Sequence, residues 1–109
     1  MLAKKYRLPW GVRFDNSRSV FTPEFVLKVK PNKLLLNRLA VVISKKIDKR
    51  AVVRNRIKRL THTVVQELQG NTKQGFDFLF IARKSIIGKG KEDFYLAIKQ
   101  FLAKEGLLK

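Results

Sequence analysis

The chain has 109 residues and a formal net charge of +17, which arises from 25 Lys and Arg against 8 Asp and Glu. Its apolar fraction of 45% can fill one small core, so we expect a single domain over residues 1–109 whose charge favours nucleic acid as its partner. Disulfides and thiolate metal sites are excluded because the sequence has no cysteine, and no apolar run approaches the roughly 18 residues that span a bilayer.

Residues 1–18 are basic and are interrupted by proline and glycine, so we expect an N-terminal arm or a short helix. No apolar stretch of a secretory signal follows the first lysines, and we therefore expect a cytoplasmic protein without membrane contact. Trp10, Arg13 and Phe14 place aromatic rings among cations, an arrangement that suits stacking on single-stranded bases. The alternative is that these rings anchor the arm to the core.

Three apolar runs predict a β-sheet. Phe25–Lys30 is rich in strand-forming residues, and Leu39–Ser44 is a continuous apolar run of the kind found in strands buried on both faces. We expect Ser19–Thr22 to extend the first strand, with Pro23 at an edge or a bulge. In the third run, Phe76–Ala82, three alternating Phe share one sheet face, where we expect core packing and keep an RNA-binding platform as the alternative.

Two segments have helical periodicity. The first covers about Lys49–Gln69, with Asp48 as a plausible N-cap and Gly70 as a stop, so that the chain contains a β-α-β unit. The second segment follows residue 90, and Gly106 after it is typical of a Schellman-type helix end. The apolar stripe of the first helix consists of Val53, Ile57, Leu60, Val64 and Leu68, and that of the second of Phe94, Ala97, Ile98, Phe101 and Leu102.

The first helix and the residues before it concentrate positive charge, with eight cations against the single acid Asp48 between Lys45 and Arg59. A merely solvated helix face would normally alternate cations with glutamates, so this concentration indicates contact with a polyanion. Planar arginine side chains also suit bidentate phosphate binding. His62 lies on the basic face, where it either contacts RNA or is exposed to solvent. The cations are Lys45, Lys46, Lys49, Arg50, Arg54, Arg56, Lys58 and Arg59.

The acidic residues are scattered, whereas a metal-dependent nuclease needs two or three carboxylates that converge on Mg²⁺. Glu92 and Asp93 stand where acids in the first turn complement a helix dipole. His62 is the only histidine, which excludes a two-histidine acid-base pair. We therefore predict that the protein has no catalytic residue and binds no metal by itself.

The stretch SKKIDKRAVVRNRIKR at Ser44–Arg59 resembles the protein component of bacterial ribonuclease P, as do FVLKVKPN before it and GFDFLFIAR after it. This resemblance covers nearly the whole chain. It implies an α/β fold of the α+β two-layer type, in which a small mixed sheet packs with helices and contains a left-handed β-α-β crossover, against the general right-handed preference. It also implies membership of a ribonucleoprotein endonuclease whose RNA subunit binds Mg²⁺ and removes the 5′ leader of precursor tRNA.

The resemblance further implies two RNA-binding regions. The sequence itself indicates no obligate protein partner. The 5′ leader would lie in a cleft between the N-terminal region and the sheet, with Phe14 as the cleft aromatic and Trp10 and Arg13 beside it. The RNA subunit would contact Arg54, Asn55, Arg56, Lys58 and Arg59, and the surface would extend to Lys45, Lys46, Lys49, Arg50 and His62.

Two departures from the family pattern affect these expectations. The family typically has an Arg-Glu pair after its basic motif, where this chain has His62 and Thr63. The N-terminal region is about four residues short, roughly one helical turn, and lacks a second cleft Phe. The alternative function is that of a ribosomal or other structured-RNA-binding protein without a role in cleavage, and a protein-only nuclease is a more distant one.

Overall fold

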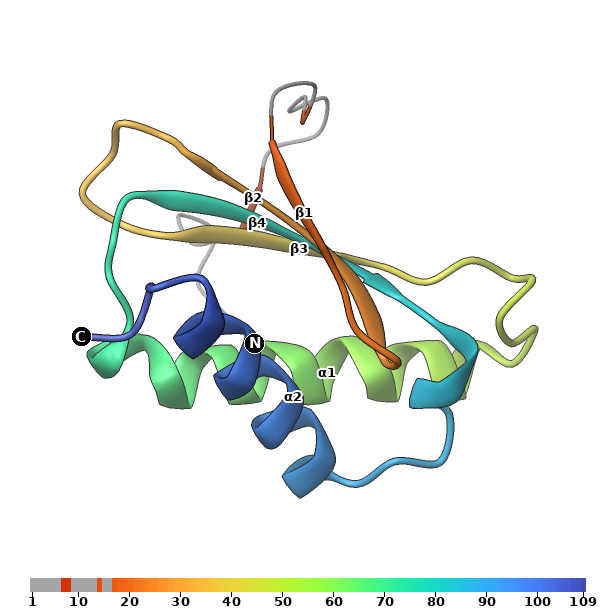
Figure 1. Ribbon diagram of the computed structural model, residues 1–109. Coiled ribbons are helices and arrows are strands. Elements are labelled where there is room, and N and C mark those ends of the chain that lie inside the picture. Colours follow the sequence, from red (N-terminus) through yellow and green to blue (C-terminus); the bar gives the residue numbers. More distant parts are fainter. Residues whose placement is uncertain (1–6, 9–13, 15–16) are drawn as a thin grey trace.

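The computed structural model describes residues 7–8, 14 and 17–109, which form a four-stranded mixed sheet with two helices on one of its faces (Figure 1). The strands lie in the order β1-β2-β4-β3, and only β3 and β4 are parallel. None of the helices in the described ranges is long and apolar enough to cross a membrane. The elements are β1 (Arg18–Phe21), β2 (Phe25–Pro31), β3 (Arg38–Val42), α1 (Ala51–Leu68), η2 (Gln69–Asn71), β4 (Phe76–Ala82), η3 (Lys84–Ile86) and α2 (Lys91–Lys104).

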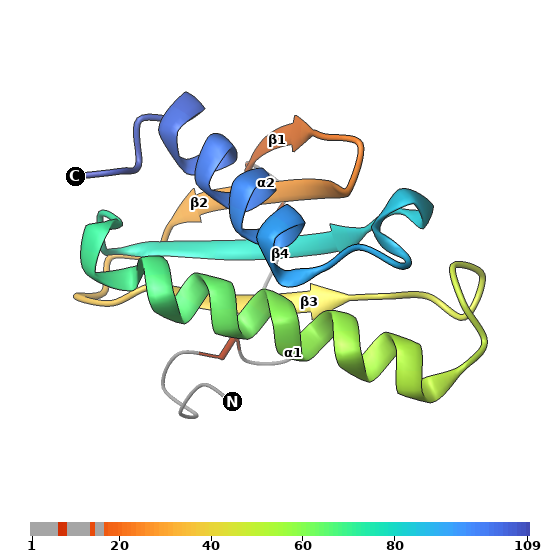
Figure 2. The same ribbon diagram turned by 90° about the horizontal axis from the view of Figure 1, so that it is seen from below.

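The predicted β-α-β unit consists of β3, α1 and β4, because β3 pairs in parallel with β4 and α1 connects them. In Figure 2, α1 lies in front of the sheet, both parallel strands run to the right, and β4 lies above β3. The chain therefore makes a left-handed crossover, as the resemblance implied. This arrangement confirms the expected mixed sheet packed with helices.

Two strand predictions were wrong. Ser19–Thr22 does not extend the first strand, because β1 is a separate strand that forms an antiparallel hairpin with β2. Thr22 closes this hairpin, with its N–H donating to the carbonyl of Phe25 at 2.9 Å. The run at Leu39–Ser44 is not buried on both faces, since its Val42 is 46% exposed. β3 is one of the two edge strands in the order β1-β2-β4-β3. Arg7 pairs with Leu39 along the outer edge of β3.

The first helix begins later than predicted. Its N-cap is Arg50, so the prediction of Asp48 at this position was wrong. The carboxylate of Asp48 instead accepts a hydrogen bond from the backbone N–H of Arg50 at 2.8 Å, which orders the turn that precedes the helix. At the other end, α1 stops at Leu68 and Gly70 lies within the following η2 turn, so the chain leaves the helix through a tighter 3₁₀ turn.

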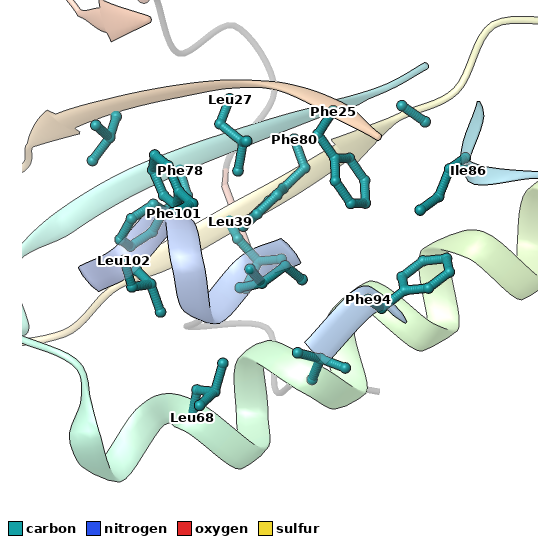
Figure 3. Close-up of a cluster of buried hydrophobic side chains, with 14 of the residues drawn as sticks. Phe25, Leu27, Leu39, Leu68, Phe78, Phe80, Ile86, Phe94, Phe101 and Leu102 are labelled. Atoms are coloured by element: carbon teal, nitrogen blue, oxygen red, sulfur yellow. The ribbon is translucent and has the colours of Figure 1, made fainter. Parts of the chain in front are cut away.

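The core lies between the helices and the inner face of the sheet (Figure 3). Phe78 and Phe80 are buried, which confirms core packing for the alternating phenylalanines. Phe78 meets Phe101 of α2 edge to face at 6.3 Å between ring centroids. The predicted stripe of α1 is correct, although it also includes Thr61, whose hydroxyl donates to the Ile57 carbonyl at 2.9 Å.

The end of α2 has the predicted Schellman geometry. Gly106 adopts a positive φ of 70°, which a residue without a side chain adopts at little cost. The N–H of Leu107 donates to the carbonyl of Leu102 at 2.8 Å, and the N–H of Gly106 donates to the carbonyl of Ala103 at 3.1 Å. The predicted apolar residues of α2 are all buried. The helix crosses in front of β2 and β4 in Figure 2, and its Phe94 and Phe101 contact Phe25 of β2 and Phe78 of β4.

A buried carboxylate holds one end of the sheet together. Asp77 of β4 is 1% exposed and accepts two hydrogen bonds from Arg38 of β3, from Nε at 2.9 Å and from one Nη at 2.8 Å. It also accepts a hydrogen bond from the amide of Asn32, at 2.9 Å, and the same amide donates to the Leu36 carbonyl. Asp77 therefore joins β3 and β4 to the β2–β3 loop.

Replacing Asp77 with Ala should lower the free energy of unfolding by about 3 kcal/mol, because Arg38 and Asn32 would lose their shared acceptor inside the protein. Urea unfolding measures this change. The control is Asp93→Ala, which removes an exposed carboxylate from the first turn of α2 and should cost less. Equal losses in both variants would contradict the role assigned to Asp77.

Candidate nucleic-acid interface

The basic loop, residues 44–50, connects β3 to α1 and presents cations to solvent. Its first half is a tight turn in which the N–H of Ile47 donates to the Ser44 carbonyl at 3.0 Å. Lys45, Lys46 and Lys49 are exposed, and Arg50 remains mostly exposed at the start of α1. The basic loop therefore places four of the eight predicted cations together at one end of the molecule.

Asp48 is the only acid in this region, and it is paired with Arg50. Its carboxylate accepts hydrogen bonds from Arg50 Nε at 3.1 Å and from one Nη at 2.8 Å, besides the backbone bond. The hydrogen bonds from the Arg50 side chain, and then the one from its backbone, lower the pKa of Asp48 to about 2. Asp48 is therefore ionised throughout the neutral range and shapes the basic loop.

Arg54 contacts the basic loop, which the sequence alone did not indicate. One of its Nη atoms donates to the backbone carbonyl of Asp48 at 3.0 Å and to that of Lys49 at 2.8 Å. The side chain thus ties the loop to the first turn of the helix. Arg54 has a structural contact in addition to its predicted contact with RNA.

The outward side of α1 carries the basic helix face, which we define as Arg54, Asn55, Lys58, Arg59 and His62. At 3.6 residues per turn these five positions fall within about 140° of rotation. Asn55, Lys58 and Arg59 are exposed, whereas Arg54 is partly buried.

Arg56 lies about 60° beyond the basic helix face, on the flank that also carries Glu67. Glu67 forms an ion pair with Lys91 of α2 at 2.5 Å, so this flank of α1 is the one next to α2. The structure therefore brings the predicted helix residues together on one face except Arg56.

His62 is partly buried, so the alternative that it is simply exposed to solvent was wrong. Its Nδ1 is buried and has no hydrogen-bond partner within the described part of the chain. Burial lowers the pKa of His62, and nearby positive charges, including Arg7 and Lys58, lower it further. At neutral pH this side chain is therefore uncharged, unlike the arginine that the family typically has here.

The outer face of the sheet, opposite the helices, is a second candidate surface. Because paired residues in neighbouring strands share a face, it consists of three rows. The row nearest the basic loop is Phe21, Val26, Ile81 and Val42; the middle row is Ser19, Lys28, Leu79 and Ala40; the last row is Lys30, Asp77 and Arg38. The two lysines come from the alternating FVLKVK run, whose pattern could have indicated this face.

Phe14 lies at the last row of the outer face. The ammonium group of Lys30 stands 5.2 Å from the centroid of the Phe14 ring, a cation-π contact. The hydroxyl of Ser17 donates to the Phe14 carbonyl at 2.6 Å. Trp10 and Arg13 lie outside the described residues.

No three His, Cys, Asp or Glu side chains come together as metal ligands in residues 7–8, 14 and 17–109. The acids at Asp48, Glu67, Asp77 and Glu105 each pair with a different cation. The functional groups that the two candidate surfaces present are therefore ammonium and guanidinium groups, one amide and aromatic rings. These groups suit binding of phosphates and bases.

Comparisons with known proteins agree in pointing to one family. A family model described as Ribonuclease P matches residues 9–106. The chain is similar to the ribonuclease P protein component of Caldanaerobacter subterraneus subsp. tengcongensis, with 38% identity over 91 residues that cover 84% of this chain and 74% of the relative. It is 40% identical over 101 residues to that of Clostridium kluyveri, covering 88% of this chain and 87% of the relative.

Solved structures show the same similarity. A Staphylococcus aureus RNase P protein, a mutant with defective mRNA degradation activity, superposes with a TM-score of 0.84 at 25% identity, covering 95% of this chain and 91% of that chain. The RNase P protein from Thermotoga maritima superposes with a TM-score of 0.66 at 25% identity, covering 84% and 82% of the two chains.

A proton NMR titration should find the pKa of His62 below its ordinary value of about 6.5, because the partly buried ring is costly to charge. The signal is unambiguous, since the sequence has one histidine. In urea-unfolded protein the midpoint should return to about 6.5. As pH falls below that value the unfolded chain takes up the proton first, so the free energy of unfolding should decrease. Identical midpoints in folded and unfolded protein would contradict this assignment.

Proposed function

The chain belongs to the ribonuclease P protein family, and we propose that it binds the family's RNA subunit through α1 and the 5′ leader of precursor tRNA through the sheet. It is a protein component of the ribonucleoprotein endonuclease ribonuclease P and functions in tRNA processing. The family match does not favour the alternative of a ribosomal protein without a role in cleavage. The concentration of cations on the basic loop and the basic helix face carries the proposal.

The RNA subunit would bind to the basic loop and the basic helix face. Exposed cations such as Lys58 and Arg59 would neutralise phosphates and release the counterions that surround RNA. The two carbonyl contacts of Arg54 support this assignment, because they hold the basic loop in place before RNA arrives. A preorganised loop loses less conformational entropy on binding than a mobile one.

The leader would bind to the outer face of the sheet. Single-stranded RNA is bound by a positively charged track combined with aromatic rings on which bases stack. Here Lys28 and Lys30 supply the charge and Phe14 supplies a ring. Arg38 is paired with Asp77, so its guanidinium group holds the sheet together and is not counted among the cations that bind RNA. Trp10 and Arg13 would add to this site from the N-terminal segment.

Cleavage would be performed by the RNA subunit and the Mg²⁺ bound to it, in the cytoplasm. The protein contributes fixed positive charge where two polyanions, the RNA subunit and precursor tRNA, approach one another. Repulsion between two RNAs otherwise has to be screened by cations from solution. The protein should therefore reduce the concentration of Mg²⁺ that the reaction needs.

The purified protein alone should cleave no precursor tRNA at any Mg²⁺ concentration, and should restore cleavage by the RNA subunit of the same source at low Mg²⁺. The physical reason is that its cations replace ions that would otherwise screen the two RNAs. The assay compares protein, RNA subunit and reconstituted complex across a Mg²⁺ series. Robust cleavage by RNA-free protein would contradict the proposal that the RNA subunit performs the reaction.

Replacing Arg59 with Ala should weaken binding of the RNA subunit by about 1–3 kcal/mol and leave stability unchanged, since Arg59 is exposed. The slope of log affinity against log salt should flatten by about 0.7–0.9 for each lost phosphate contact. Arg54→Ala should weaken binding and also lower the free energy of unfolding by about 1 kcal/mol, because the carbonyls of the basic loop lose their donor.

The matched control for these two variants is Lys99→Ala, which removes an exposed cation from α2. It should leave both affinity and salt slope close to those of the unmodified protein. An unchanged salt slope in Arg59→Ala would show that Arg59 makes no phosphate contact.

A further inference from the structure

An aromatic side chain is exposed on the outer face of the sheet. Phe21, the last residue of β1, is 71% exposed. Its neighbour Val20 packs against the core, so Phe21 points to the other face by the alternation of a strand. It stands beside Val26 in the row nearest the basic loop, and that row ends in Val42, which is 46% exposed.

This row is apolar from one edge of the sheet to the other, whereas the last row consists of Lys30, Asp77 and Arg38. Phe14 accompanies the last row, through its contact with Lys30. The outer face therefore has one aromatic ring, Phe21, at the end nearest the basic loop and another, Phe14, at the opposite end. Lys28 and Lys30 lie on β2, which runs between these two ends.

We propose that Phe21 is a second base-stacking residue of the single-stranded RNA site on the outer face, and that it takes a different leader nucleotide from Phe14. This inference rests on the proposed binding of the leader to the sheet. Phe21 would supply from β1 the second aromatic ring that the shortened N-terminal region lacks.

The spacing supports two separate nucleotides. Val26, the partner of Phe21, and Lys30, the partner of Phe14, are four residues apart on β2. At about 3.3 Å per residue this separation is roughly 13 Å, several times the thickness of one stacked base. Lys28 lies midway and on the same face, where it can bind the phosphates between the two bases.

The chemistry of the face favours RNA as its occupant. A protein partner of ordinary composition would place side chains over Lys28 and Lys30 and would have to remove charged ammonium groups from water. A single strand of RNA pairs these cations with phosphates while its bases cover the apolar row. A second copy of this chain would add a further +17 of charge to the contact, which disfavours self-association.

The test uses the holoenzyme reconstituted with the RNA subunit of the same source, and a series of precursor tRNAs that carry one abasic nucleotide at successive leader positions. In the unmodified holoenzyme, loss of a stacked base should weaken binding by about tenfold at each stacking position. In Phe21→Ala the penalty should disappear at one position, and in Phe14→Ala at a different one. Binding of mature tRNA should be unchanged in both variants.

Two further variants separate stacking from bulk and from fold. Phe21→Trp should bind precursor tRNA as tightly as the unmodified protein does. Phe21→Leu keeps the apolar volume but has no aromatic ring, so it should lose most of the roughly tenfold gain in affinity that stacking provides. Leu96→Ala, which removes an exposed apolar side chain from α2, is the matched control and should have no effect. Urea unfolding should give the same stability for every variant at position 21, since Phe21 is largely exposed.

The outcomes distinguish this inference from the function on which it rests. If Phe14→Ala weakens precursor binding and Phe21→Ala does not, the inference about Phe21 fails and the leader site stands. If neither variant distinguishes precursor from mature tRNA, the leader site on the sheet itself fails. If Phe21→Ala instead converts a dimer into a monomer in sedimentation experiments without changing leader binding, the apolar row is a contact between copies and the inference is overturned.

Discussion

Parallel neighbouring strands cannot be joined by a tight turn, so the pairing of β3 with β4 requires a connection that crosses the sheet. In this protein the connection is α1, preceded by the basic loop. The crossing forces one stripe of α1 against the inner face of the sheet and leaves the opposite side of the helix free. The loop must emerge at the end of β3, next to that free side. The strand pairing thus determines where the cations of the loop and the helix meet.

Four acidic side chains form ion pairs that join parts of the structure. Because each of them pairs with a cation of the fold, much positive charge remains at the surface. Asp77 joins β3 to β4 through Arg38, and Glu67 joins the two helices through Lys91. Glu105 pairs with Arg18 at 2.8 Å, which connects the end of α2 to β1, and Asp48 orders the basic loop. Each of these acids is opposite a cation that belongs to the architecture. The exposed cations of the basic helix face, and Lys28 and Lys30 on the outer face, are left to bind phosphates.

The sequence predicted those features that depend on local pattern. Helical spacing identified the buried stripes of both helices, and Gly106 identified the end of α2, because these signals lie within one or two turns of chain. The handedness of the crossover came only from the resemblance, since no local pattern encodes it.

The features that the sequence missed depend on contacts made after folding. Asp48 looked like an N-cap, yet it orders the preceding turn, because the helix begins after Arg50. The sequence indicated a solvent-exposed cation at Arg54, yet in the folded protein its side chain donates to two backbone carbonyls of the basic loop. The apolar run of β3 did not indicate that this strand lies at an edge of the sheet. The four residues of β1 were too few for their alternation to show which face carries Phe21.

The contact of Arg7 and Leu8 with β3 has a consequence for the behaviour of the protein in concentrated solution. The N–H of Leu8 donates to the Leu39 carbonyl at 2.9 Å, which occupies part of the outer edge of an apolar strand. Unpaired strand edges recruit strands from other molecules and begin aggregation. Here Arg7 and Leu8 cover part of an edge that is made about thirty residues later, which leaves less of that edge open to β-pairing with another molecule.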